Sequence, residues 1–213
     1  MGMKRLLGGA LTGIALAAAL PTWASAAEFN FRNLFHAYMK LDRFYDYEDS
    51  VDDYMQTFRP QVWNNRDVLV MPEKRAETLK MMKEEAAAYD LNDPFDIVTD
   101  STLGEYDVTA QRFGFQPFDH TTYFYVHGGV GSLAHDIRLT ITNPEFVSGL
   151  PLPKEKAKVF LDNRKNGYGI DRSVRLHLKI KAARLMSDWS LGGEIVSIEV
   201  VDPKQQAILW RNP

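Results

Sequence analysis

The hydrophobic period of this chain changes near Asp93-Pro94, and this change divides the sequence into two kinds of structure. Before it, apolar residues recur in steps of three and four, which is typical of helices with one buried face. After it, β-branched and aromatic residues alternate with polar ones, which is typical of strands. We therefore predict an α+β fold, in which a helical region (residues 27–93) and a mainly antiparallel α+β region (residues 94–213) form one compact domain.

Three helices are expected in the first region. The first covers residues 31–45, where the apolar side chains fall on one face. The second starts at a cap formed by Asp49 or Ser50 and ends at Pro60, because proline cannot continue a helix. The third opens at Met71-Pro72, where proline suits the first helical turn, and it stops before residue 94.

The second region is expected to contain about six or seven strands, with one helix inserted between them. The clearest strand is Arg172–Ala183, and two further runs, Glu194–Val201 and Ala207–Trp210, complete an antiparallel meander. The inserted helix covers Lys154–Asn163. We also expect Phe95–Thr99 to pair in a hairpin with residues 106–115.

The first 26 residues have the three parts of a secretory signal peptide. Lys4 and Arg5 give a positive start, an uncharged apolar run follows from Leu6 to Leu20, and Ala24-Ser25-Ala26 offers small residues for cleavage. The run is shorter than the roughly 20 residues that a membrane-spanning helix needs, so we favour a cleaved signal over a retained anchor. No second apolar span follows, so we expect an exported protein, periplasmic or extracellular, with no membrane anchor after cleavage.

The chain contains no cysteine, which excludes disulfides, thiolate ligands and a lipidated cysteine. Because secreted eukaryotic domains often rely on disulfides, this absence favours a bacterial periplasm. Without residues 1–26 the chain has 23 basic and 28 acidic side chains, a net charge of −5. This acidic balance argues against nucleic acid or an anionic membrane surface as the partner.

Histidines gather in one part of the second region and suggest a zinc site. Imidazoles and a carboxylate on neighbouring strands could supply the ligands, although none of the compact helical spacings of zinc enzymes is present. The alternative is that these are polar residues of loops. The candidate metal ligands are His120, His127, His135 and Asp136.

Basic side chains alternate with apolar ones along the clearest strand. They could dock an acidic partner or an anionic glycan, or they could form a solvent-exposed face paired with acids such as Glu199. The candidate binding residues of this stripe are Arg175, His177, Lys179 and Lys181.

Two aromatic residues fall outside the helical stripes. Most aromatic residues of the first region lie at helical spacing and are expected in the core, but Tyr47 and Trp63 do not. Because exposed aromatic side chains are common at binding surfaces, we include both as candidate binding residues.

The sequence contains no catalytic motif of high specificity. The glycine-rich segment 127–132 lacks the ending of a phosphate-binding loop, the acidic segment 42–53 lacks the glycine and glutamate of an EF-hand, and no Gly-x-Ser-x-Gly elbow occurs. We therefore expect a non-catalytic protein that binds an envelope protein or glycan and needs no cofactor. Two alternatives stay open: a secreted zinc-dependent hydrolase built on His120, His127 and His135, and a small-ligand carrier with an enclosed pocket.

Overall fold

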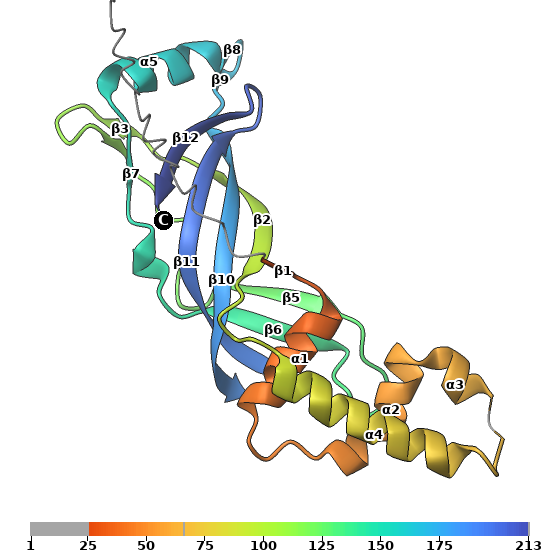
Figure 1. Ribbon diagram of the computed structural model, residues 1–213. Helices are drawn as coiled ribbons and strands as arrows, with labels where there is room; N and C mark the ends of the chain where they lie inside the picture. The colour runs from red at the N-terminus through yellow and green to blue at the C-terminus, as the bar shows by residue number, and fades with distance from the viewer. Residues whose placement is uncertain (1–25, 66, 213) are drawn as a thin grey trace, which may run out of the picture.

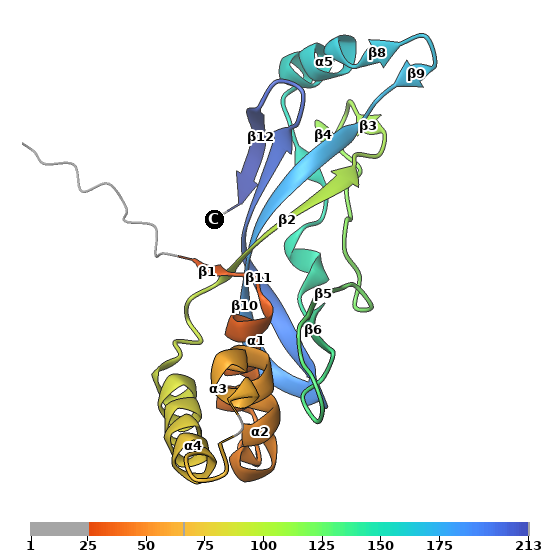
Figure 2. The same ribbon diagram turned by 90° about the vertical axis from the view of Figure 1, so that its right-hand side faces the viewer.

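Two long antiparallel strands, β10 (Ser173–Ser187) and β11 (Ser190–Asp202), run through most of the molecule (Figure 1). The computed structural model describes residues 26–65 and 67–212, so the signal peptide predicted for residues 1–26 lies outside the described residues except for Ala26. Four helices gather at one end of the strand pair, and α5 lies at the other end (Figures 1 and 2). The predicted α+β class is confirmed.

Every other strand of the main sheet is attached to this pair, directly or through one neighbour. Among the described residues the sheet has seven strands, in the order β1-β2-β10-β11-β6-β5, and β12 also pairs with β11. The β1–β2 and β6–β11 pairs are parallel and the others are antiparallel, as predicted for a mainly antiparallel sheet. The remaining strands are β1 (Ala27–Glu28), β2 (Phe95–Thr102), β5 (Tyr123–His127), β6 (Asp136–Ile141) and β12 (Ala207–Asn212).

The meander predicted for the end of the chain is confirmed, because β10, β11 and β12 pair antiparallel in sequence order. The second edge of β11 is shared, since its beginning pairs with β6 and its end pairs with β12. Between these two parts the register with β10 shifts, so that Val196 is an extra residue of a bulge. The bulge keeps Ile195 and Ile198 on the same buried face of the sheet.

The hairpin expected between Phe95–Thr99 and residues 106–115 does not form, and that prediction was wrong. β2 pairs with β10 along Phe95–Thr102 instead, which buries Phe95 and Ile97 in the core. This non-local pairing prevails because β10 offers a long partner with alternating apolar side chains. The chain then forms a small separate sheet and a short helix: β3 (Tyr106–Asp107), β4 (Arg112–Phe113), η1 (Pro144–Phe146) and β7 (Leu150–Pro151).

The helical end contains α1 (Phe31–Leu41), α2 (Tyr47–Phe58), α3 (Pro60–Asn64) and α4 (Met71–Ala88). The first helix packs against the sheet and contributes fully buried side chains such as Leu34 and Phe35 to the same core as the strands. It ends at Leu41, earlier than predicted, and Pro60 both ends α2 and opens α3.

The cap of α2 differs from the sequence prediction. Asp46, rather than Asp49 or Ser50, forms it, because the Asp46 carboxylate accepts hydrogen bonds from the N–H groups of Glu48 (3.0 Å) and Asp49 (3.1 Å). Tyr47 therefore becomes the first helical residue. An acidic cap also favours the positive end of the helix dipole.

The turn between β10 and β11 joins the sheet to the helical end. Trp189 adopts a left-handed backbone conformation with φ of 57°, which costs a non-glycine residue about 1–2 kcal/mol. Its ring stacks on Tyr38 of α1 with the ring centroids 4.6 Å apart, and it lies 6.1 Å from the ring of Phe35. The Trp189 carbonyl also accepts a hydrogen bond from the N–H of Arg138 on β6 (2.9 Å).

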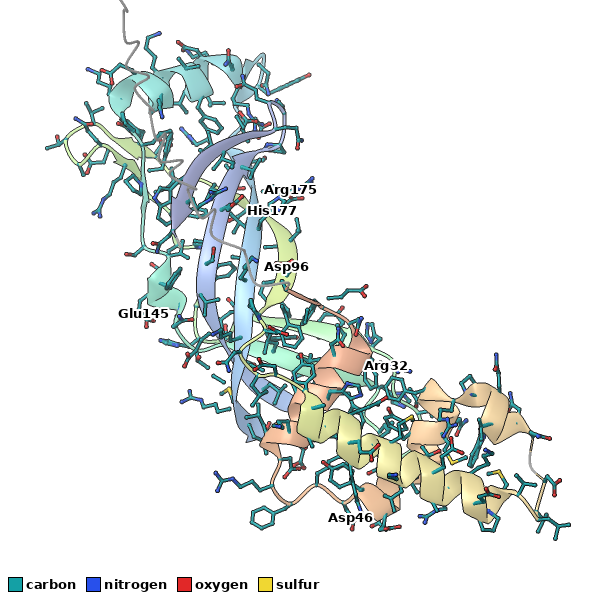
Figure 3. The ribbon with its side chains drawn as sticks, in the orientation of Figure 1. Arg32, Asp46, Asp96, Glu145, Arg175 and His177 are labelled. Atoms are coloured by element: carbon teal, nitrogen blue, oxygen red, sulfur yellow. The ribbon has the colours of Figure 1, made fainter. Side chains whose placement is uncertain are left out.

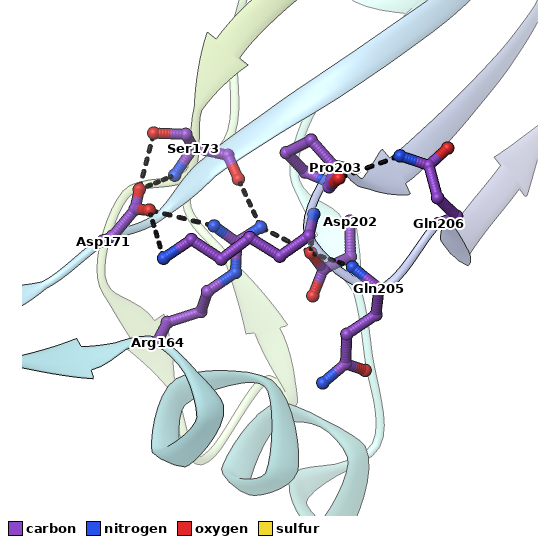
Figure 4. A network of polar contacts seen from close by, with 8 residues as sticks. Arg164, Asp171, Ser173, Asp202, Pro203, Gln205 and Gln206 are labelled. Carbon is purple, nitrogen blue, oxygen red and sulfur yellow. Dashed lines mark hydrogen bonds and ion pairs between the residues drawn. The ribbon is translucent and has the colours of Figure 1, made fainter.

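A buried arginine holds the opposite end together (Figure 4). Arg164 follows directly after α5 (Lys154–Asn163), a helix with the predicted bounds, and it precedes the short hairpin of β8 (Lys165–Asn166) and β9 (Gly169–Ile170). Its guanidinium donates to Asp202 (2.6 Å), to Asp171 (2.9 Å) and to the carbonyl of Ser173 (3.2 Å).

The network connects three segments of the chain, of which the β11–β12 turn is distant in sequence from the other two. Asp202 is also buried, and it accepts hydrogen bonds from the backbone of Lys204 and Gln205 in the β11–β12 turn. Hydrogen bonds from Ser173, assisted by Lys204 and by the charge of Arg164, hold the pKa of Asp171 well below its usual range. The end of α5, the start of β10 and the β11–β12 turn are therefore fixed to one another by paired charges.

Replacing Asp202 should destabilise the protein strongly. Asp202→Ala leaves the Arg164 charge buried without its closest partner, and breaking a buried pair in this way typically costs about 3–5 kcal/mol. Urea unfolding of the purified protein, followed by circular dichroism, measures the change. Asp162→Ala is the matched control, because Asp162 pairs with Lys158 and Lys165 on the surface and its loss should change the midpoint little. Equal effects of the two substitutions would contradict a special role of the network.

Candidate binding site on the open sheet face

The two faces of β10 have opposite characters. Val174, Leu176, Leu178 and Ile180 are buried in the core, and the predicted basic stripe alternates with them on the other face. Figure 3 shows Asp96, Arg175 and His177 along the same side of the sheet. We call this side, which carries the outward side chains of β2, β10, β11 and β12, the open face.

The open face contains a groove of about 460 Å³. The groove crosses β2, β10, β11 and β12, and each of these strands contributes one or two outward side chains to it. Its side-chain lining consists of Asp96 and Val98 from β2, His177 and Lys179 from β10, Ser197 and Glu199 from β11, and Arg211 from β12, together with Ile97 and Leu178 at its base. Two residues of the predicted stripe, His177 and Lys179, thus lie in a hollow that other strands complete.

The acids on the neighbouring strands balance the basic stripe. The cross-strand register places Arg175 opposite Asp100 and Lys179 opposite Asp96 on one side. The other side of the stripe faces β11, where the register pairs His177 with Glu199 and Lys181 with Glu194.

Ion pairs between neighbouring strands form on this face. Arg175 donates through Nε to Asp100 (2.9 Å), and this hydrogen bond raises the pKa of Arg175. Glu199 pairs with Arg211 of β12 (2.5 Å). The stripe is therefore one row in a surface of alternating charge, and Glu199 is among the acids beside it, as the second interpretation of the sequence expected.

Sequence reasoning named Glu199 as an acid that could pair with the stripe, but it missed the other residues that β2, β11 and β12 add to the groove. Asp96, Val98 and Asp100 alternate with buried residues of β2, so their outward direction could have been read from the pattern. Their position beside the basic stripe depends on the pairing of β2 with β10. The sequence pattern had instead predicted a pairing of this segment with residues 106–115.

Tyr47 belongs to α2 and Trp63 to α3, two helices at the helical end (Figure 1), and neither residue lines the groove. Tyr47 is half-buried at the start of α2, with its ring 5.0 Å from that of Tyr45 and with the Lys83 ammonium 5.8 Å from its centre. Burial raises the pKa of Tyr47. Trp63 is half-buried in α3. The structure does not bring these two residues to the basic stripe.

The structure brings only two of the four predicted zinc ligands together. The β5–β6 register places His127 opposite Asp136, and their Nδ1 and Oδ1 atoms are in contact. The Nδ1 atom of His135 lies 3.1 Å from the carbonyl oxygen of Gly129, and His120 lies in the turn before β5. Within residues 26–65 and 67–212, no group of three or more His, Asp or Glu side chains could hold a metal ion. The hydrolase alternative therefore has no metal centre in this part of the chain.

The glycine-rich segment holds a carboxylate of the chain itself. The N–H of Ser132 donates to Oδ2 of Asp53 on α2 (2.5 Å). Gly131 has φ of 62°, and a Cβ there would lie only 2.0 Å from Oδ1 of Asp53. This loop is thus a docking point between α2 and the β5–β6 connection, and an internal anion occupies the place that a phosphate would take.

Removing the Asp53 carboxylate should loosen this connection. We expect Asp53→Ala to lower the free energy of unfolding by about 1–3 kcal/mol, since it deletes a hydrogen bond to a charged acceptor. Hydrogen exchange should show faster exchange of the Ser132 amide, and urea unfolding gives the magnitude. Asp52→Ala is the matched control on the same helix, because Asp52 pairs with Arg75 at the surface. A Ser132 amide that exchanges at the same rate in both variants would contradict the docking role.

None of the helices in the described part of the chain is long and apolar enough to cross a lipid bilayer. A protein-family model described as "Domain of unknown function (DUF4852)" matches residues 46–163 of the 213. The chain therefore belongs to this family. The matched region runs from the cap of α2 to the end of α5, so it includes the β2 side of the groove but not β10, β11 or β12. No curated protein and no solved structure matches the chain.

Proposed function

We propose that this member of the DUF4852 family is an exported, non-catalytic protein that binds a protein of the bacterial cell envelope through the groove on its open face. The observation that supports this most is the lining of the groove by charges of both signs from four strands. The strands hold these side chains in a fixed register, so the surface is ordered before a partner arrives.

The alternation of charge favours a protein as the partner. Rows of opposite charge steer and orient a partner that bears a complementary pattern, and they disfavour partners that do not. A polypeptide surface can present both acidic and basic groups at strand spacing, whereas a neutral or uniformly anionic glycan cannot match both. Arg175 is paired with Asp100, and Arg211 is paired with Glu199. These ion pairs fix the positions of the charges in advance, so a binding partner would meet an ordered surface.

An envelope glycan is the second candidate. The groove combines the hydroxyl of Ser197, the imidazole of His177 and the carboxylate of Asp96, which together supply hydrogen-bond donors and acceptors for sugar hydroxyls. The experiment on the groove below separates the two candidates.

Export requires the apolar run at the start of the chain. We expect the full chain, expressed in a Gram-negative bacterium, to be recovered outside the cytoplasm with Ala27 as its first residue, since Ala24-Ser25-Ala26 precedes that bond. Leu11→Arg places a charge in the run and should leave uncleaved precursor in the cytoplasm. Leu11→Ile is the matched control and should be exported normally. Mass spectrometry of each cell fraction measures the outcome, and cytoplasmic full-length protein from the unmodified chain would contradict export.

The groove is tested by placing a photo-crosslinking amino acid at Ser197, in its lining, and at Lys80, on the exposed side of α4. Illumination of cells should give a specific adduct from position 197 and none from position 80. Adding Lys179→Glu should reduce the adduct roughly tenfold, because it reverses one charge of the pattern. Lys80→Glu is the matched reversal and should leave the adduct unchanged.

The nature of the adduct identifies the class of partner. An adduct removed by protease treatment supports an envelope protein, whereas one removed by muramidase supports the glycan. Equal adducts from positions 197 and 80 would contradict the groove as the binding site.

A further inference from the structure

One edge of the main sheet is left open at β5, the last strand in the sheet order. Among residues 26–65 and 67–212, β5 pairs with β6 alone, from Tyr123 opposite Thr140 to His127 opposite Asp136, with no register shift. The N–H of Ile141 donates to the carbonyl of Thr122 (2.9 Å), and the N–H of Gly128 donates to the carbonyl of His135 (3.0 Å).

These two hydrogen bonds fix the direction of every backbone group in β5. In an antiparallel ladder, alternate residues point their N–H and C=O toward the same neighbour. Since Thr122 and Gly128 face β6, Phe124 and Val126 face it too, and Tyr123, Tyr125 and His127 point their backbone groups to the open edge. No hydrogen bond within the described residues uses those outward groups.

This edge lacks the usual protection against pairing. Natural edge strands carry lysine, proline, bulges or inward charges that block a further strand. The sequence Tyr-Phe-Tyr-Val-His contains no acidic residue, lysine, arginine or proline, and its pairing has no bulge. By contrast, the pairing of β12 has a bulge, and β2 carries Asp96 and Asp100.

The side chains of β5 are also incompletely covered. Tyr123 is 46% exposed and Tyr125 is 51% exposed. Phe124 and Val126, which point to the core side, are only half-buried. An additional strand along this edge would cover apolar surface on both faces of the sheet at once.

We propose that a second copy of this chain occupies the edge, with β5 pairing antiparallel to β5 of the partner about a two-fold axis at Tyr125. Such an interface is self-complementary, because outward backbone groups meet outward backbone groups, and the register centred on Tyr125 pairs all five residues of β5 with those of the copy. Tyr125 then lies opposite the partner's Tyr125, and Tyr123 lies opposite the partner's His127. Aromatic cross-strand pairs are favourable, and the strand carries no lysine, arginine or acid to repel its copy.

The first test separates backbone pairing from side-chain contact. Sedimentation of the purified protein should show a dimer whose fraction rises with concentration. Tyr125→Pro removes an N–H that makes no hydrogen bond within the chain, so the fold should persist, but dimerisation should weaken at least roughly tenfold because hydrogen bonds of the interface are lost. Tyr125→Thr is the matched control, because it also removes the ring but keeps the N–H, and it should still dimerise more strongly than the proline variant.

Two results of this test would overturn the proposal. One is a wild-type protein that stays monomeric at the highest concentration reached. The other is a threonine variant as monomeric as the proline variant, since that result would assign the contact to the tyrosine ring rather than to the strand edge.

The second test does not depend on proline being tolerated. The chain has no cysteine, so a single substitution introduces the only thiol. Hydrogen-bonded antiparallel residues lie about 5.5 Å apart at Cα, within the range that a disulfide spans, so Tyr125→Cys should form a disulfide-linked dimer under mild oxidation. Tyr168→Cys is the control, because Tyr168 is fully exposed between β8 and β9, far from β5. Equal cross-linking of the two variants, or none at position 125, would overturn the two-fold register.

Discussion

The ladder between β10 and β11 is the interaction on which the rest of the structure depends. Its inner face supplies the central side chains of the core, and its outer face supplies the middle rows of the groove. Its two edges receive β2, β6 and β12, so that strands from both halves of the chain take their positions from one pair. A change in its register by one residue would exchange the buried and exposed side chains of both strands. The register between the two strands shifts at three places, and the shift at Val196 lies where the partner of β11 changes from β6 to β12.

The two ends of the ladder are secured by different physical means. At the helical end, Trp189 has an unfavourable left-handed backbone conformation. Stacking of its ring on Tyr38 offsets this cost and holds α1 against the sheet. At the other end, Arg164 and Asp202 form a buried ion pair, whose stability depends on both partners being present. The stacking contact keeps part of its stability when a side chain is shortened, whereas the buried ion pair becomes destabilising when either partner is removed. We therefore regard the α5 end as the part of the fold most sensitive to a single polar substitution.

The sequence pattern predicted elements well where local period decides them. The bounds of α5 followed from its helical period, and the meander of β10, β11 and β12 followed from alternating strands that pair with their neighbours in sequence. Pairing between distant strands was less accessible, so β2 was given the wrong partner. The same limit applied to the site: the sequence suggested Glu199 as a partner of the basic stripe, but Asp96 and Asp100 could be placed beside the stripe only once the β2–β10 pairing was known. The glycine-rich loop was interpretable only after Asp53, far away in sequence, was found within it.

The groove and the open edge of β5 belong to one sheet, and this has a consequence for binding. A two-fold axis that pairs two edge strands antiparallel runs perpendicular to the sheet, so both copies present the same face to the same side. Two grooves would then lie on one continuous surface. A partner with repeated binding sites, as in an ordered envelope layer, would engage both, and the second contact would form at a high effective concentration. Even a modest affinity of a shallow, charge-balanced groove would then suffice for stable attachment, so the proposed pairing of β5 would strengthen the proposed binding at the groove.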